Sequence, residues 1–321
     1  FEPDLARSLS NLGNRLAETG RRGEALAAEQ EAVEIRRRLA ADNPAAFEPD
    51  LARSLNNLGI RLAEIGRPGD GLPPTEQSVE IRRRLAVDNP AAFEPDLARS
   101  LSNLGNRLAE TGRRGEALAA EQEAVEIRRR LAADNPAAFE PDLARSLSNL
   151  GIQLSQAGRH GEALTATEQA VGVYQRLAAD NPAAFEPDLA TSLSNLGIRL
   201  AEAERHDDAL TATEQAVGIR RRLAVGDPTA FEPDLATSLS VLALIFTAKG
   251  ELLRALRATE EAVEIFRRYV GTLPSAVPQL HAVLSVQAMS LDGIGSQQEA
   301  DEVRRWLEEH PLPSDGSAAE C

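Results

Sequence analysis

The side chains best suited to chemistry in this 321-residue chain are arginines and asparagines that recur in pairs. Arg7 and Asn11 are four residues apart, which places both on one face of a helix. The asparagine returns every 46 residues, and in the first four copies the arginine precedes it. The predicted binding residues are Arg7, Asn11, Arg53, Asn57, Arg99, Asn103, Arg145, Asn149 and Asn195.

This pattern predicts hydrogen bonding to an extended peptide. Asn offers both a donor and an acceptor, so a row of asparagines can hold the backbone of a peptide of any sequence. Arg adds a fork of donors for carboxylates. Five contacts at about 1 kcal/mol each, less the cost of ordering the peptide, predict weak to micromolar binding. In the structural alternative, the asparagines only join neighbouring repeats, and Arg7 only pairs with a nearby acid.

The paired residues belong to a longer repeat. Copies start at Phe1, Phe47, Phe93, Phe139, Phe185 and Phe231, with a degraded seventh from about residue 277. The first and third copies are identical letter for letter. A fixed period in this range is typical of a solenoid. We therefore expect an all-α fold, a right-handed superhelix of about seven antiparallel helical hairpins over residues 1–310, followed by a disordered tail over residues 311–321.

Each copy predicts two helices. Residues 2–4, Glu-Pro-Asp, suit the first turn of a helix, and Gly20 suits its left-handed C-terminal cap. The second helix is expected to start near Gly23, to run for ~17–19 residues and to stop at Asn-Pro, residues 43–44. Phe47 is expected to precede the next hairpin and to pack into the junction.

Four local features carry separate predictions. Pro73 and Pro74 should delay the second helix of their copy to near Leu72, because proline clashes with the preceding turn. Glu204 replaces the cap glycine, so this turn should either carry about 1 kcal/mol of strain or relax. The run 36–38, Arg-Arg-Arg, predicts a solvated face pairing with Glu, with an anion-binding ridge as the alternative. Val241, Leu244 and Val286 predict either extra core under a cap or an apolar pocket.

The repeat resembles the tetratricopeptide repeat. The matching residues are Asn11, Leu12, Gly13, Asn14, Gly20, Glu24, Ala25, Leu26, Ala32 and Val33. The family unit is about 34 residues, and this longer unit is similar to those of kinesin light chains and related bacterial proteins. The resemblance implies protein or peptide binding in a concave groove lined by the first helices. Asparagine rows act in this way in kinesin light chain and in O-linked N-acetylglucosamine transferase.

Composition argues against several other functions. The formal charge is −15, the repeats are near neutral, and no basic stripe suggests a nucleic-acid partner. His160 and His206 occupy equivalent turn positions with no converging ligands, so we expect neither a metal nor a cofactor. An enzyme is not expected, because a catalytic centre is asymmetric and two copies here are identical. Cys321 is the single cysteine, which excludes an internal disulfide.

The chain is therefore expected to be a binding scaffold for a protein or peptide. One alternative is a spacer or a self-assembling rod that stacks through its first repeat, and another is the sensing or regulatory arm of a larger signalling protein. No stretch suggests a membrane span, so the cytoplasm is the default location. Because the chain starts without Met, inside a repeat, we expect a fragment of a longer protein.

Overall fold

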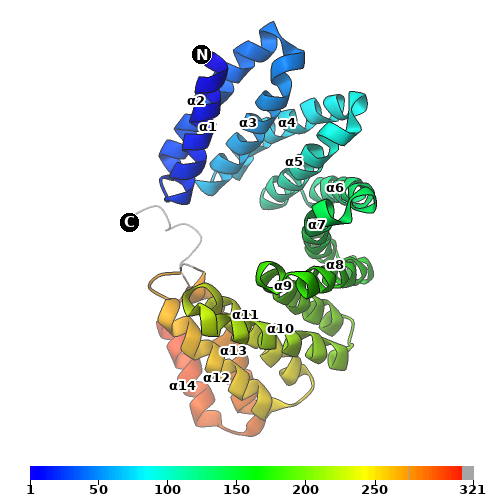
Figure 1. Cartoon of the computed structure of the whole chain (residues 1–321). Coiled ribbons are helices and arrows are strands. Elements are labelled where there is room, and N and C mark those ends of the chain that lie inside the picture. The colour runs from blue at the N-terminus through cyan, green and yellow to red at the C-terminus, as the bar shows by residue number, and fades with distance from the viewer. Residues whose placement is uncertain (274, 313–321) are drawn as a thin grey trace. The chain divides into compact units, whose positions relative to one another are not determined.

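The computed structural model describes residues 1–273 and 275–312, and these ranges contain fourteen helices and no strand (Figure 1). The helices are α1 Glu2–Glu18, α2 Arg22–Asp42, α3 Pro44–Glu64, α4 Pro68–Asp88, α5 Pro90–Glu110, α6 Arg114–Asp134, α7 Pro136–Gln156, α8 His160–Asp180, α9 Pro182–Glu202, α10 His206–Gly226, α11 Pro228–Ala248, α12 Leu252–Tyr269, α13 Ala276–Ile294 and α14 Gln297–Glu309. In sequence order they form seven helix–turn–helix repeats. The predicted all-α repeat fold is confirmed.

The chain divides into two compact units, residues 1–159 and residues 160–321. The first unit holds α1 to α7 and the second holds α8 to α14. Within each unit, every helix packs against the next one in sequence (Figure 1). The apolar stripes of leucine, alanine and valine meet between these neighbours, so that the core extends along the array.

The first helix of each internal repeat starts earlier than expected. The Asn-Pro pair both stops one helix and starts the next: Asn43 Oδ1 accepts from the Ala46 backbone N–H at 3.3 Å, and Pro44 takes the first helical position. The same cap recurs at α5, α7 and α9, and Asp227 provides it at α11. The predicted opening at Glu-Pro-Asp therefore holds for α1 alone, where the chain begins.

These early starts change the position of the repeated phenylalanine. Phe47 lies inside α3 instead of before the hairpin, but it is half-buried and packs against the core, as predicted. The second helices are also longer than expected, with 21 residues in α2, α4, α6, α8 and α10. The extra length of this repeat is thus shared between both helices.

The predicted late start of the proline-containing helix is wrong. α4 is continuous from Pro68, with Pro73 and Pro74 inside it. Both prolines lie in its second turn and lack the N–H that would donate to a carbonyl four residues earlier. The helix therefore loses only two backbone hydrogen bonds, both to carbonyls of its first turn. Leu72, just before the prolines, and Val79, after them, are buried in the core formed with α5, which compensates for the weakened start.

The turn at Glu204 does not relax. Glu204 adopts φ 59°, the left-handed conformation that Gly20 and its equivalents use. The flanking hydrogen bonds are those of the glycine turns: Glu204 N–H donates to Ala201 C=O at 3.0 Å, and Arg205 N–H donates to Leu200 C=O at 2.9 Å. Packing of the two helices on either side therefore holds the strained residue in place.

The expectation that no stretch suggests a membrane span needs one correction, at α11. By length and composition it is a candidate membrane span, the one such helix among the described residues, and 44% of its most apolar window is buried. Leu235, Leu239, Leu242 and Phe246 of α11 lie in the core with α12 and α13, and this packing explains the helix's apolar composition. The predicted tail falls mostly outside the described residues, which end at Leu312.

Candidate functional site

The predicted asparagine ladder lies on the first helices α1, α3, α5, α7 and α9. Asn11 is exposed, whereas its equivalents Asn57, Asn103, Asn149 and Asn195 are half-buried. Among the described residues, four of the five asparagines make no side-chain hydrogen bond. Their amide groups are therefore free to bind a ligand.

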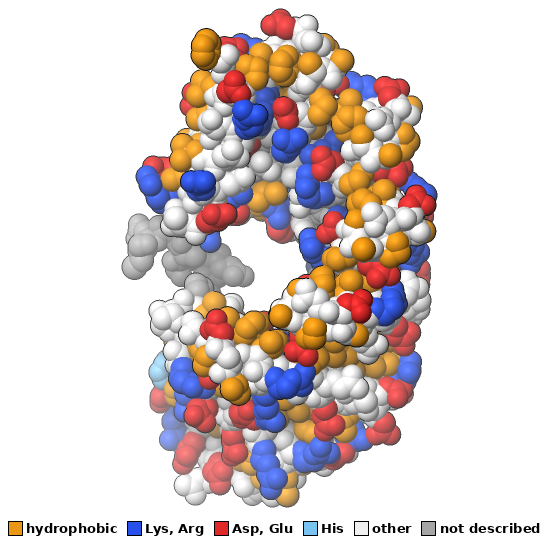
Figure 2. Space-filling model, in the orientation of Figure 1, with side chains coloured by type: hydrophobic (Ala, Val, Ile, Leu, Met, Phe, Trp, Pro, Cys, Tyr) orange, Lys and Arg blue, Asp and Glu red, His pale blue; other side chains and the backbone are white. Residues whose placement is uncertain are grey.

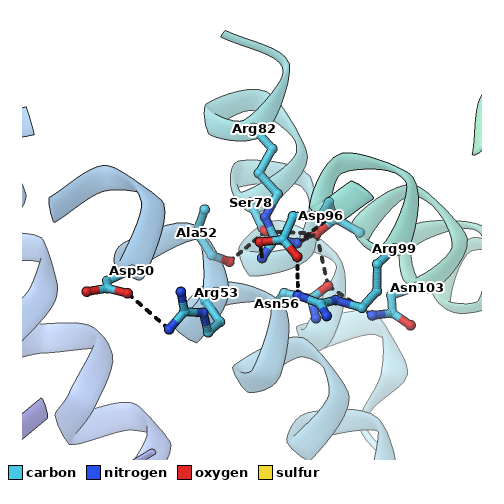
Figure 3. Close-up of polar contacts among 10 residues, drawn as sticks. Asp50, Ala52, Arg53, Asn56, Ser78, Arg82, Asp96, Arg99 and Asn103 are labelled. Carbon is cyan, nitrogen blue, oxygen red and sulfur yellow. Dashed lines mark hydrogen bonds and ion pairs between the residues drawn. The ribbon is translucent and has the colours of Figure 1, made fainter. Parts of the chain in front are cut away.

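Asn103 is the exception and joins two repeats. Its Nδ2 donates to Asn56 Oδ1 at 3.0 Å (Figure 3). Asn56 is buried and also accepts from Ser100 Oγ at 3.2 Å. The other repeats among α1–α12 have Ser at the position of Asn56, which is too short to make the same contact. The structural alternative for the ladder therefore applies to Asn103.

Each arginine of the ladder pairs with the aspartate three residues before it on the same helix. The pairs are Arg7–Asp4 at 2.5 Å, Arg53–Asp50 at 3.1 Å, Arg99–Asp96 at 2.5 Å and Arg145–Asp142 at 3.3 Å. The arginine side chains are 53–70% exposed. Exposed pairs of this kind contribute about 0–1 kcal/mol, so a ligand carboxylate can replace the aspartate at little cost.

A second row of arginines follows the ladder and was missed in the sequence. Its members pair with the glutamate three residues later: Arg61–Glu64 at 2.6 Å, Arg107–Glu110 at 2.9 Å and Arg199–Glu202 at 3.0 Å. The arginine side chains are only 12–15% exposed. Arg61 follows Asn57 by four residues, so helical spacing could have found this row on the ladder face.

The predicted solvated arginine ridge is wrong for its first member. Arg36 is 4% exposed and donates from Nη1 to Ser10 Oγ at 2.9 Å and to Ser54 Oγ, bridging two repeats. Arg37 and Arg38 are exposed and pair with glutamates, as predicted. Three further buried arginines occupy the position of Arg36, namely Arg82, Arg128 and Arg220. Each of these arginines follows a buried valine by three residues, and this spacing could have identified them as buried from the sequence.

These buried arginines hold repeats together. Arg82 Nη1 donates to the Asp96 carbonyl at 2.8 Å and to Ser100 Oγ, linking α4 to α5 (Figure 3). Burial lowers the pKa of Arg82 to about 10, so the side chain remains charged at neutral pH. The row therefore acts in stability, not in ligand binding.

Two buried glutamates belong to the same network. Glu29 accepts from Ser10 Oγ at 3.1 Å, and Glu121 accepts from Ser102 Oγ at 3.2 Å. Each carboxylate keeps its second oxygen buried without a hydrogen-bond partner. Burial raises the pKa of both carboxyl groups. The other four repeats among α1–α12 have Thr at this position.

We expect the double substitution Glu29→Thr/Glu121→Thr to stabilise the protein near neutral pH. A raised folded-state pKa contributes stability that is present below the unfolded pKa and is lost as pH rises through the folded value. Each unsatisfied buried oxygen costs about 1–3 kcal/mol, so the variant's advantage should grow to that order as pH rises from 4 to 8.

Urea melts followed by circular dichroism across this pH range measure the effect. Glu31→Thr is the control, because Glu31 lies exposed on the same helix. Equal pH slopes for the wild type and the double variant would contradict the prediction.

The remaining predicted features give no site of their own. His160 Nδ1 lies 3.4 Å from a Glu202 carboxylate, and no group of metal-binding side chains occurs among the described residues. Val286 is buried in the core, while Leu244 is about half exposed on α11. The apolar residues singled out in the last two repeats therefore lie partly in the core and partly at the surface. Figure 2 shows acidic and basic side chains interspersed over the visible face.

Comparison with solved structures finds the same fold. The apo form of RapI is 14% identical with a TM-score of 0.65, covering 95% of this chain and 99% of its own. BtubC (BKLC) from P. vanneervenii is 18% identical with a TM-score of 0.55, covering 92% and 96%. A putative kinesin light chain from Podosopora anserina, with nearly identical TPR-like repeats, is 22% identical with a TM-score of 0.51, covering 66% and 93%. A search of curated proteins finds no match.

Family matches agree with the helical repeats. The tetratricopeptide repeat matches residues 5–45, 97–137 and 142–222, which together make up half of the chain. Such repeats generally form protein–protein interaction scaffolds and typically carry no catalytic centre. From its repeat matches and its sequentially packed helix pairs, this chain belongs to the tetratricopeptide-repeat family.

Proposed function

We propose that the protein holds an extended peptide segment of a protein partner against the polar face of its first helices. The observation that carries this proposal is the set of half-buried asparagines without partners, Asn57 and Asn149 in the first unit. A half-buried amide that lacks a partner favours a ligand that supplies one. Asn195 on α9 offers the same group in the second unit, where we propose the same role.

The exposed arginines add selectivity for acidic peptides. Arg53 and Arg145 each exchange an intrahelical aspartate for a ligand carboxylate, and such an exchange changes the free energy little. The asparagines then provide affinity for the peptide backbone, and the arginines favour sequences that carry Asp or Glu. Binding in the micromolar range follows, because a few neutral hydrogen bonds must also offset the ordering of the peptide.

We expect the triple variant Asn11→Ala/Asn57→Ala/Asn149→Ala, which removes the three ladder amides of the first unit that have no partner, to bind peptide at least tenfold more weakly. Three lost hydrogen bonds at about 0.5–1.5 kcal/mol each correspond to that factor or more. Dodecamer peptides selected by phage display on the wild-type chain serve as the probes, and fluorescence anisotropy gives their dissociation constants. Gln30→Ala/Gln77→Ala/Gln122→Ala is the matched control, since it removes three amides from the second helices.

Equal weakening by both triple variants would contradict the proposal, as would no weakening by the asparagine variant. Circular dichroism must first show that both variants remain helical.

A further inference from the structure

A pocket of about 380 Å³ lies between α10 and α12 in the second unit, and α11 forms its floor. This volume is within the usual range for a small organic ligand. The pocket faces away from the ladder: Val241 stands on α11 where the ladder has asparagine, and Leu239, which lines the pocket, is about 200° away around the helix. The pocket is therefore a separate site from the one proposed for the peptide.

An apolar floor and a charged rim line this pocket. The floor consists of Val217, Leu239, Leu242, Phe246 and Ala258, and the rim carries Glu214, Arg221, Arg254, Arg257 and Glu261. The Arg221 and Arg254 side chains are 54% and 50% exposed, so their guanidinium groups are accessible to a ligand. Three arginines against two glutamates give the rim a net charge of +1.

Two of the three arginines are already held in place. Arg254 Cζ lies 4.1 Å from the centre of the Phe246 ring, and the side chain donates to Glu214 at 2.9 Å. Arg221 pairs with Glu261 at 2.5 Å. A guanidinium has five N–H donors, and neither arginine uses all of them. Both can therefore bind an anion without first being ordered.

Arg257 is the third arginine of the rim. It is exposed, and among the described residues it makes no hydrogen bond and no ion pair. Its charge is repelled by the neighbouring arginines and is compensated by no partner of its own. An anion placed among the three arginines removes this imbalance.

The sixth repeat departs from the earlier repeats at these positions. Arg254 stands where the five earlier repeats have Asp or Glu, and Arg257 where they have Ala, Pro or Thr. Gly218 leaves the wall open, since a Cβ there would meet nothing within 4 Å, whereas the first three repeats have Glu. The equivalent positions between α4 and α6 have a net charge of −3, from Arg83, Glu76, Glu80, Glu116 and Glu123. An acidic groove has thus become a basic one.

We infer that this pocket binds a carboxylate carried on an apolar group. The arginine forks match the two oxygens of a carboxylate, and a single negative charge compensates the rim. The apolar group lies against the floor and against the methylene carbons of the arginine side chains. A phosphate monoester brings about two negative charges, more than the rim compensates. A neutral ligand leaves Arg257 without a partner.

Two substitutions test the pocket with residues that other repeats already use. Gly218→Glu places a carboxylate in the pocket wall, and Glu favours helix more than Gly, so this variant should fold. Arg257→Thr removes the unpaired cation and leaves the residue of the fourth and fifth repeats. Gly172→Glu is the matched control, because it makes the same change one repeat earlier, outside the pocket.

The probe is 3-phenylpropanoate, with the neutral 3-phenylpropanamide as its control. Saturation-transfer NMR on the full chain detects the ring protons of both compounds. We expect the signal of the acid to be at least threefold larger than that of the amide at equal concentration. It should fall at least threefold in Gly218→Glu and in Arg257→Thr and stay unchanged in Gly172→Glu.

A second arm separates a free acid from the C-terminal residue of a protein, which carries the same chemistry. Displacement of the probe by the peptide Gly-Gly-Gly-Gly-Phe, but not by its C-terminal amide, would support the inference and assign the carboxylate to the end of a partner chain. Failure of both peptides to displace it would support the inference with a free acid as the ligand. Displacement by both would overturn the inference.

Equal signals from the acid and the amide would also overturn the inference, as would a signal that neither Gly218→Glu nor Arg257→Thr reduces. Displacement by equimolar acetate would show that the apolar group is not required, and an equal fall in Gly172→Glu would show that binding lies elsewhere; either result contradicts the assignment.

Discussion

Arg82→Ala should lower the free energy of unfolding by about 3 kcal/mol, whereas Arg82→Tyr should change it by less than about 1.5 kcal/mol. Arg82 is 2% exposed, and truncation would leave a cavity beside α5. It would also leave Ser100 Oγ and the Asp96 carbonyl without their donor.

Tyrosine should be tolerated because the fold already uses aromatic residues there. Tyr174 and Phe266 occupy the equivalent position in the fourth and sixth repeats, and both are buried. Replacing a buried charge with a well-packed neutral side chain removes its desolvation cost, which offsets the lost hydrogen bonds.

Urea unfolding followed by circular dichroism measures both variants. Arg83→Ala is the control: Arg83 is next in sequence, is exposed and pairs with Glu123, so its loss should cost less than about 1 kcal/mol. If Arg82→Ala costs no more than Arg83→Ala, the buried arginines do not hold the repeats together.

Gly59→Val should have an effect of similar size, lowering the free energy of unfolding by about 3 kcal/mol. A Cβ atom at Gly59 would collide with Thr75 Oγ1 and lie 3.0 Å from the Gly71 carbonyl oxygen. Gly71 faces Gly59 in turn, so the backbones of α3 and α4 meet directly here. Neither backbone can move without separating the pair, and overpacking of this kind costs about 1–3 kcal/mol, occasionally more.

Gly69→Ala is the matched control for this substitution. Gly69 lies in the first turn of α4, and a Cβ there would meet nothing within 4 Å. Alanine also favours helix, so this variant should be neutral or slightly more stable. A Gly59→Val protein with the control's unfolding midpoint would show that the close approach of α3 and α4 is not required.

The sequence by itself determined the repeat, the helical class and the glycine turns. These features are local: the spacing of apolar residues sets a helix, and a left-handed C-terminal cap favours Gly20 whatever lies around it. Identity between the first and third copies also made a repeated fold certain before any contact was known. The ladder face of the first helices followed from the four-residue spacing of Arg7 and Asn11.

Only the tertiary structure decided which polar residues are buried and which are free. Arg36 and Arg37 are adjacent in sequence, yet one bridges two repeats and the other faces solvent, because burial depends on how closely the next repeat approaches. The same holds for Asn103, whose side chain has a partner in Asn56, and for Gln153, whose buried Oε1 has none. Such outcomes depend on contacts between residues about 20 to 47 positions apart, which helical spacing within one repeat does not describe.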